Sequence, residues 1–178
     1  MITMTEIVRI PAERVKVLMG ENGSAKKRIE GRCNVELDID PEGEIGIIGD
    51  PADVFFARDI VKAIGRGFNA NDALRLMGQD YGLYVIQLKE HTSSDKAIGR
   101  LKGRIIGENG RIKLQIEDAT DSIVSVYGST VSIISRIDTM EYAKEAIGLL
   151  VDGARHTSVL RYLAKVKRDI MENRLKGR

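Results

Sequence analysis

Apolar and polar positions follow two periods along the chain, and the same succession of periods occurs twice. Residues 35–39 (VELDI) alternate apolar and acidic side chains, which is typical of a half-buried strand. β-Branched residues before Pro11 predict another strand, which ends there because proline cannot donate to a sheet ladder. With their counterparts in the second half, the predicted strands cover residues 6–10, 35–39, 45–48, 84–88, 123–127 and 130–134.

Helices are predicted between these strands. The helix after the third strand has a clear start, with Asp50 at the cap, Pro51 at the first helical position and Asp53 at the third. In the second half, Asp138 is predicted to cap the corresponding helix, and Asn69 to cap a short connector. The predicted helices cover residues 12–19, 24–30, 50–64, 70–77, 95–106, 111–119 and 139–151.

The four residues Gly-Glu-Asn-Gly occur twice, at 20–23 and 107–110, each time between two predicted helices. At this offset of 87 residues Lys26 falls on Lys113, and further along the matching offset becomes 86. Two copies of one unit, in the order strand, helix, helix, strand, strand, helix, explain these matches. We therefore predict an α+β fold with a first domain and connector at 5–77, a second domain at 78–155 and a basic helix at 156–178.

The chain has 178 residues and a net charge of +2, but the charge is unevenly distributed. Residues 155–178 hold eight basic and two acidic side chains, a net of +6, which leaves −4 for the remainder. Both Gly-Glu-Asn-Gly loops also lie in basic neighbourhoods, and such local potential favours a polyanionic ligand. The single cysteine, Cys33, excludes an internal disulfide, and the N-terminus lacks a signal-peptide pattern, so a cytoplasmic location is expected.

A glycine-bounded turn that leads into a helix suits a phosphate ligand. Without Cβ atoms, the loop backbone can adopt unusual dihedral angles and approach a ligand closely. The free N–H groups and the positive dipole end of the following helix face the same ligand. A P-loop is excluded because Gly-x-x-x-x-Gly-Lys-Ser/Thr is absent, and the dinucleotide fingerprint Gly-x-Gly-x-x-Gly is absent as well.

The second loop and its surroundings, GRIIGENGRIKLQIE at 103–117, resemble the core motif of the KH family of single-stranded nucleic-acid-binding modules. The segments AIGRGFNANDALRLM at 63–77 and SVYGSTVSII at 125–134 extend the resemblance to a family of archaeal and eukaryotic pre-ribosomal proteins with tandem KH domains, over roughly residues 5–165. The resemblance implies two type I KH domains (βααββα) packed together, and a role in small-subunit rRNA maturation.

In the KH family the glycine loop clamps the backbone of about four nucleotides, while an apolar groove takes the bases. The resemblance implies RNA-binding residues Gly20, Glu21, Asn22, Gly23, Lys26, Lys27 and Arg28 in copy one, and Arg104, Ile105, Ile106, Gly107, Glu108, Asn109, Gly110, Arg111 and Lys113 in copy two. Of these, Arg104, Arg111 and Lys113 are expected at phosphates. The expected groove-lining residues are Ile105, Ile106, Val124 and Val126. Because an arginine and two isoleucines just precede the second clamp, we expect the second loop to contribute more.

The resemblance implies binding near the 3′ end of small-subunit rRNA and contact with the endonuclease that trims that end. From the residues themselves we expect neither a cofactor nor catalysis. Eukaryotic family members have generally lost the loop of their first copy, whereas this chain keeps it, so RNA binding by copy one stays open. The alternative is an adaptor of ribosome assembly that docks protein partners. An RNA-processing enzyme ranks last, since the sequence shows no metal motif and the duplication explains why Glu30 matches Glu117.

Three interpretations compete for the basic segment 161–178. It is an RNA-contacting helix, a helix that docks a protein partner, or a packed terminal helix whose bases face solvent. The apolar stripe of the last helix consists of Val159, Leu163, Val166 and Ile170.

Overall fold

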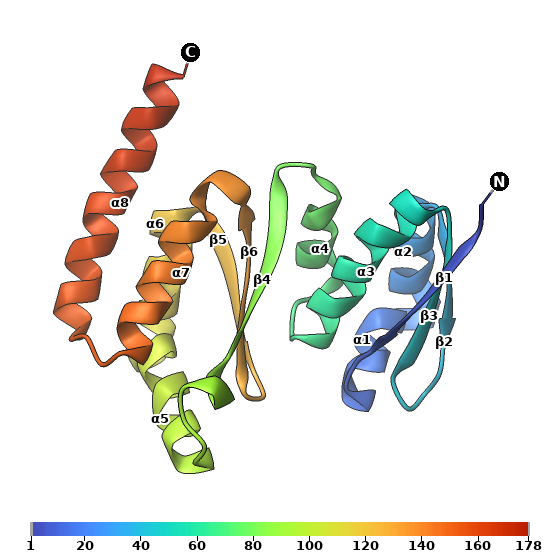
Figure 1. Ribbon diagram of the computed structural model, residues 1–178, viewed down its shortest axis with the longest axis horizontal. Helices are drawn as coiled ribbons and strands as arrows, with labels where there is room; N and C mark the ends of the chain where they lie inside the picture. Colours follow the sequence, from blue (N-terminus) through green and yellow to red (C-terminus); the bar gives the residue numbers. More distant parts are fainter. Residues whose placement is uncertain (1, 178) are drawn as a thin grey trace. The chain divides into compact units, whose positions relative to one another are not determined.

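The computed structural model describes residues 2–177, which divide into two compact units. Unit one runs to Gln79 and unit two begins at Asp80 (Figure 1). Each unit contains one antiparallel sheet of three strands together with its helices. Among the described residues, no helix combines the length and apolar character that a membrane span requires.

Unit one realises the predicted order of elements. Its sheet has the strand order β1-β3-β2, so the strand that is last in sequence lies in the centre. The Asp50 carboxylate accepts a hydrogen bond from Ala52 N at 3.1 Å and caps the long helix as predicted. The elements are β1 (Met4–Arg9), α1 (Val15–Met19), α2 (Ser24–Cys33), β2 (Val35–Ile39), β3 (Glu44–Gly49), α3 (Pro51–Gly65) and α4 (Ala70–Ala73), with 3₁₀ turns at Ala12–Arg14, Glu21–Gly23 and Leu74–Met77.

Unit two repeats this order and adds a terminal helix. Its sheet has the equivalent strand order, β4-β6-β5. The elements are β4 (Tyr81–Gln87), α5 (Asp95–Ile106), α6 (Arg111–Thr120), β5 (Ser122–Tyr127), β6 (Thr130–Arg136), α7 (Ile137–Val151) and α8 (His156–Lys176), with 3₁₀ turns at Leu88–Glu90 and Glu108–Gly110. The α+β fold class and the duplication predicted from the sequence are confirmed.

Two local predictions were wrong. Asp138 does not cap α7: Arg136 occupies the cap position, and the Asp138 carboxylate accepts a hydrogen bond from its guanidinium at 3.2 Å instead. The fourth strand begins at Tyr81, three residues before the predicted start at residue 84, because its ladder with β6 extends to the pair of Tyr81 and Arg136. Sequence patterns locate the centre of an element better than its ends, where single hydrogen bonds decide.

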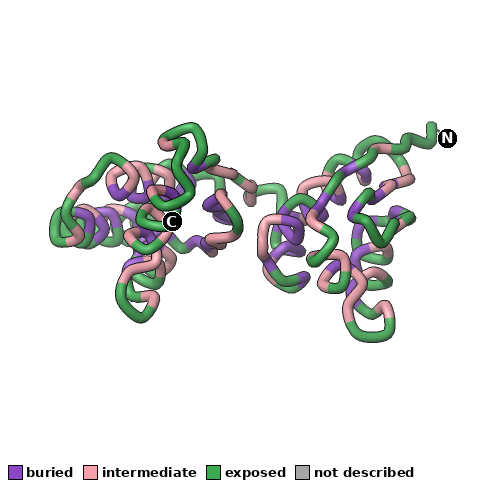
Figure 2. The backbone as a smooth tube through the Cα atoms, turned by 90° about the horizontal axis from the view of Figure 1, so that it is seen from below, coloured by how far each residue is buried: buried purple, intermediate pink, exposed green. Residues whose placement is uncertain are grey.

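Each unit buries its own hydrophobic core (Figure 2). In unit one, α2 contributes Ile29 and β2 contributes Leu37, both almost completely buried. In unit two, strands β5 and β6 and helices α5–α8 supply one continuous cluster, which includes the completely buried Ile116 and Ile133. Side chains fixed in these cores hold the helix–loop–helix segments of both units in place.

Helix α8 packs against unit two along its apolar stripe. Its four stripe residues are all buried: Val159, Leu163, Val166 and Ile170. The Tyr162 hydroxyl donates to Glu145 of α7 at 2.8 Å, and burial raises the pKa of Tyr162. Lys167 and Arg174 pair with Asp118 and Asp121 at the end of α6, at 2.6 and 2.8 Å. The contacts of α8 therefore agree with the third interpretation, a packed terminal helix. The function of its other exposed basic side chains stays a prediction.

Candidate nucleic-acid interface

The two Gly-Glu-Asn-Gly loops have the same backbone conformation. The first glycine has φ 71° and ψ 177° in Gly20, and φ 75° and ψ 174° in Gly107. Asn22 and Asn109 both lie in the left-handed region, with φ 54° and 53°. The last glycine of each loop is left-handed as well, at φ 75° and 76°. The duplication has thus preserved a loop geometry that most residues with a side chain disfavour.

The two glycines of each loop are needed for different reasons. A Cβ atom on Gly107 would lie 2.4 Å from Cγ1 of Ile112, and one on Gly20 would lie 2.7 Å from Cβ of Ala25. The first glycine therefore lets the following helix pack tightly against the loop. A Cβ atom on Gly23 or Gly110 would meet nothing within 4 Å, so that position requires glycine only for its dihedral angles and leaves the loop backbone accessible.

Each loop presents an accessible helix N-terminus. The central Glu and Asn residues are exposed in both copies: Glu21, Asn22, Glu108 and Asn109. Helices α2 and α6 begin directly after the loops, at Ser24 and Arg111, and neither has a side-chain cap. The first N–H group of each helix, that of Ser24 or Arg111, donates to the carbonyl oxygen of Glu21 or Glu108 within the turn. The positive dipole end of each helix still faces the loop and favours an anion such as a phosphodiester.

Arg104 is engaged by the fold. Its guanidinium donates to the carbonyl oxygen of Leu150 at 3.1 Å and to that of Ala154. These carbonyls lie at the C-terminal end of α7 and just beyond it, where helical carbonyls lack partners and a cation is favourable. The backbone carbonyl of Arg104 in turn lies 3.1 Å from Nε2 of His156. We therefore remove Arg104 from the expected phosphate ligands.

The equivalent cap in unit one comes from Arg14. Its Nε donates to Ile64 O at 2.8 Å and its Nη2 to Phe68 O at 2.7 Å. Burial is the main cause of its lowered pKa. Ile64 and Phe68 match the acceptors of unit two at the offset of 86, but Arg14 lies six residues before its loop and Arg104 only three. Sequence alignment of the copies missed this shared contact because its donors lie at different positions.

The matching glutamates tie the second helix of each motif to an edge strand. Glu117 Oε1 accepts from Val124 N at 2.9 Å and lies 3.1 Å from Lys113 Nζ. In unit one, Glu30 Oε1 accepts from Leu37 N at 2.9 Å, and Lys26 Nζ lies 3.8 Å away. This structural contact explains the match of the two glutamates. It also engages both lysines, which leaves less of their charge for a phosphate.

The expected groove residues divide into two groups. Ile105 is completely buried and Val124 is 3% exposed, so both belong to the core of unit two. Ile106 and Val126 are only partly buried and can contact a base. Among the cations, Arg111 is exposed directly after the second loop, and Lys27 and Arg28 are exposed in the helix that follows the first loop. The structure thus reduces the predicted set to the loops, these three cations and a short apolar surface.

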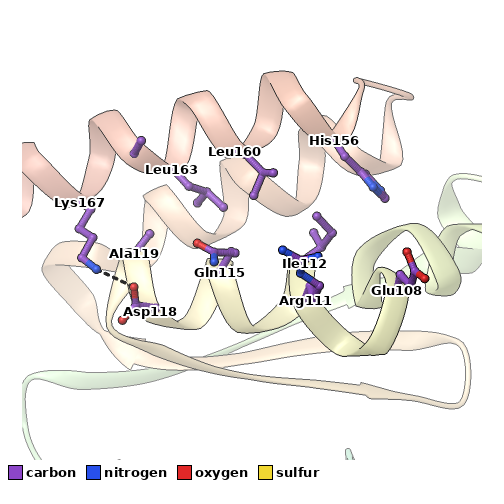
Figure 3. Close-up of a pocket in the computed structure, with 11 residues that line it drawn as sticks. Glu108, Arg111, Ile112, Gln115, Asp118, Ala119, His156, Leu160, Leu163 and Lys167 are labelled. Carbon is purple, nitrogen blue, oxygen red and sulfur yellow. Dashed lines mark hydrogen bonds and ion pairs between the residues drawn. The ribbon is translucent and has the colours of Figure 1, made fainter.

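A hollow of about 540 Å³ lies beside the second loop, between α6 and α8 (Figure 3). Its floor is apolar, with Ile112, Ala119 and Leu163, and Gln115 of α6 lies across from Leu160 of α8. The ion pair of Asp118 and Lys167 closes one end, and Glu108 of the loop lies at the other (Figure 3). Sequence reasoning did not find this hollow, since residues about 50 positions apart form it. Within residues 2–177, no group of three His, Cys, Asp or Glu side chains is arranged for a metal ion.

Comparison with known protein families assigns both units. A model described as "Eukaryotic type KH-domain (KH-domain type I)" matches residues 82–168, and one described as "KH domain" matches residues 5–63. These ranges contain both glycine loops. In a type I KH domain the loop lies between the first two helices, as it does in each unit here.

Similar proteins occur in archaea and eukaryotes. The chain is 44% identical to KH domain-containing protein MJ0443 of Methanocaldococcus jannaschii, over 95% of this chain and 77% of that protein. It is 34% identical to pre-rRNA-processing protein PNO1 of Chaetomium thermophilum, over 67% of this chain and 46% of that protein. The chain thus spans less than half the length of this eukaryotic relative.

Solved structures extend the similarity to the whole fold. Dim2p of Pyrococcus horikoshii OT3 matches with a TM-score of 0.85 and 43% identity, over 91% of this chain and 99% of that one. A structure described as an a/eIF2alpha-aDim2p-rRNA complex from the same organism matches with a TM-score of 0.88 and 43% identity, over 94% of this chain and 96% of that one. The chain therefore belongs to the family of tandem KH-domain proteins that includes archaeal Dim2 and eukaryotic PNO1.

Proposed function

We propose that the protein binds single-stranded RNA through its two glycine loops and acts in maturation of small-subunit rRNA. The observation that carries this proposal is the common conformation of the loops, each exposed at an uncapped helix N-terminus. Two relatives support it: one is called a pre-rRNA-processing protein, and another is described in a complex with rRNA.

In this proposal the RNA backbone lies against the glycine loop, and the nucleobases turn toward the β-sheet. In unit two, the phosphate lies at the N-terminus of α6, where the helix dipole favours an anion, and Arg111 supplies positive charge beside it. Ile106 and Val126 offer partly exposed apolar surface to a base. In unit one, Lys27 takes the place of the cation. A duplex does not fit this arrangement, because its bases are stacked and paired rather than splayed.

The place of binding we propose is near the 3′ end of small-subunit rRNA, with no chemistry carried out by this chain. The enzyme that trims this end is then a partner. An adaptor function, in which the KH folds also dock protein, is the second candidate. The Pyrococcus horikoshii complex of a/eIF2alpha, aDim2p and rRNA favours it, since protein and nucleic acid there share one assembly.

Fluorescence anisotropy with a labelled RNA from the 3′ end of small-subunit rRNA tests the proposal. We expect the single strand to bind much more tightly than the same sequence annealed to its complement. Equal affinity for both forms would contradict the proposed groove. Incubation with and without divalent ions, followed by gel analysis of the RNA, detects any cleavage and so tests the enzyme alternative directly.

A further inference from the structure

A second hollow, of about 310 Å³, lies in unit one beside α2. Arg28 and Arg32 of α2 line it together with Arg75 of the 3₁₀ turn that follows α4, and Asn71 and Leu74 complete the lining. All three arginines are exposed. Among residues 2–177, no carboxylate lies within ion-pair distance of these three guanidinium groups, although nine such pairs occur elsewhere in that range.

Three gathered cations without a carboxylate are unfavourable in the absence of a ligand. Arg28 and Arg32 are four residues apart on one helix, a spacing at which like charges repel and destabilise the helix. Arg75 adds a third positive charge from a different element. An anion in the hollow removes this repulsion, and it also gains hydrogen bonds from guanidinium groups whose planar forks match phosphate oxygens.

The same place in unit two differs in its charge. At the offset of 87, Arg28 corresponds to Gln115 and Arg32 to Ala119, while at the offset of 86, Leu74 corresponds to Leu160 and Arg75 to Arg161. Gln115, Ala119 and Leu160 all line the hollow between α6 and α8. The hollow therefore occurs in both copies. In unit two, Arg111 and Lys167 also line it, but Lys167 is paired with Asp118, whereas the three arginines of unit one have no carboxylate partner among the described residues.

The hollow lies along the helix that starts at the first glycine loop. Because an α-helix rises by about 1.5 Å per residue, Arg28 lies roughly 7.5 Å and Arg32 roughly 13.5 Å along the axis from Gly23. An RNA strand bound at the first loop therefore reaches these arginines if it continues along α2. The glycine loop at the start of this helix is suited to phosphate, so an RNA strand can bind at the loop and at the arginines together. An acidic protein segment would bind at the arginines alone.

We propose that the hollow formed by Arg28, Arg32, Arg75 and Asn71 binds a phosphate of the RNA backbone, beyond the nucleotides held at the first loop. This inference rests on the proposed function, because it requires RNA at unit one. It deepens that function by giving copy one a phosphate contact that the family's loop does not include. The Asn71 amide adds an uncharged donor beside the three cations.

The test is a variant with Arg28→Gln, Arg32→Gln and Arg75→Gln, measured by anisotropy with single-stranded RNA over a series of salt concentrations. We expect binding at least tenfold weaker than wild type. The slope of log affinity against log salt should fall by about 0.7 for each phosphate that the variant no longer binds. Since all three side chains are exposed, the midpoint of thermal unfolding should stay near that of wild type.

A matched control removes the same charge elsewhere, with Lys62→Gln, Lys89→Gln and Lys96→Gln, three exposed lysines. This control should bind within about twofold of wild type, because none of the three lysines lines the hollow or belongs to a glycine loop. If the arginine variant binds RNA as tightly as the lysine control, the inference is overturned while the proposed function stands. If wild type fails to bind single-stranded RNA, the proposed function is overturned and the inference falls with it.

NMR of the arginine side-chain N–H signals distinguishes the occupant. RNA should shift the signals of Arg28, Arg32 and Arg75, and a polyglutamate peptide should not. Shifts with the peptide but not with RNA would assign the hollow to an acidic protein segment and overturn the proposal.

Discussion

The two units share a fold and a loop conformation but differ in what lies beside the second helix of each motif. In unit one, the short α4 and the turn after it accompany α2, and the hollow between them carries arginines. In unit two, the 21-residue α8 accompanies α6 and buries four apolar side chains. The loop, which needs particular dihedral angles, has hardly changed between the copies, whereas the flank has changed in both length and charge.

The comparison also shows that a contact can be kept while the residue that makes it changes position. Both units satisfy the carbonyls at the end of the closing helix with an arginine from the first helix segment, Arg14 or Arg104. The acceptors match in the two copies because each lies at the end of the closing helix, where carbonyls lack the usual intrahelical donor four residues on; Ile64 O and Leu150 O also accept from Gly67 N and Gly153 N at 3.2 Å. The donors need only reach them, so a long side chain from either of two adjacent turns suffices.

The largest expected effect comes from the first glycine of each loop. Gly107→Ala should lower the free energy of unfolding of unit two by about 3 kcal/mol or more, since a Gly-only backbone conformation and overpacking each cost about 1–3 kcal/mol. Ile112 would have to move, because the new Cβ atom lies 2.4 Å from its Cγ1. Chemical denaturation followed by circular dichroism measures the change.

Gly110→Ala is the matched control within the same loop. Its Cβ atom meets no neighbour, so only the left-handed dihedral angles oppose it, at a cost of about 1 kcal/mol. Equal destabilisation by the two changes would refute the distinction between a packing glycine and a dihedral glycine.

The next largest effect concerns the two capping arginines. Arg104→Met in unit two and Arg14→Met in unit one should each lower the free energy of unfolding by about 2–3 kcal/mol, because each removes charge-assisted hydrogen bonds to two carbonyls.

RNA binding by Arg104→Met, measured well below its unfolding temperature, should keep the salt dependence of wild type. Arg111→Gln should do the opposite, with unchanged stability and a salt slope smaller by about 0.7. A reduced slope for Arg104→Met would return this residue to the phosphate ligands.

Sequence patterns predicted what depends on local chemistry. The strands, the paired loops, the Asp50 cap and the order of elements all follow from periodicity and from glycine, proline and capping residues close together in the chain. The roles of Arg104, Ile105 and Val124 could not be predicted in the same way. Whether a side chain next to the loop faces solvent, a carbonyl or the core depends on the closing helix and the sheet, which are distant in sequence.

A smaller difference in the pH dependence of stability is expected at the end of α2 and of α6, where Cys33 of unit one corresponds to Thr120 of unit two. Burial is the main cause that raises the pKa of the Cys33 thiol from 9.0 to about 11. The protonated thiol therefore stabilises unit one fully below pH 9, and this contribution is lost as the pH rises toward 11. Thr120 does not titrate, and its hydroxyl donates to Ile116 O at 2.7 Å.

Cys33→Thr copies the side chain of unit two into unit one and isolates this effect. Urea denaturation of wild type and variant below pH 9 and near pH 11 should show a smaller loss of stability in the variant. The comparison cancels the titration of lysines and tyrosines, which both proteins share. Identical losses would mean that Cys33 does not titrate in this range. Wild-type Cys33 should also react slowly with thiol reagents near neutral pH, because it is 2% exposed and protonated.

The smallest predicted effect is the difference between the two glycine loops in their contribution to RNA affinity. The sequence favoured the second loop because Arg104, Ile105 and Ile106 just precede it. The fold engages Arg104 through two carbonyl oxygens and buries Ile105 completely. Lys113 is paired with Glu117, so Arg111 is the exposed cation that remains just after that loop. After the first loop, Lys27 and Arg28 are both exposed. These contacts favour the reverse ranking, in which unit one contributes at least as much as unit two.

Asn22→Asp and Asn109→Asp test this ranking with matched changes. Both asparagines are exposed and left-handed, and aspartate tolerates that conformation, so neither variant should unfold. Each adds a carboxylate beside Glu21 or Glu108 where the phosphate is expected, which should weaken binding by about 1 kcal/mol in a partly screened site. We expect Asn22→Asp to weaken binding of single-stranded RNA at least as much as Asn109→Asp. A clearly larger loss with Asn109→Asp, at equal thermal stability, would restore the second loop as the main site.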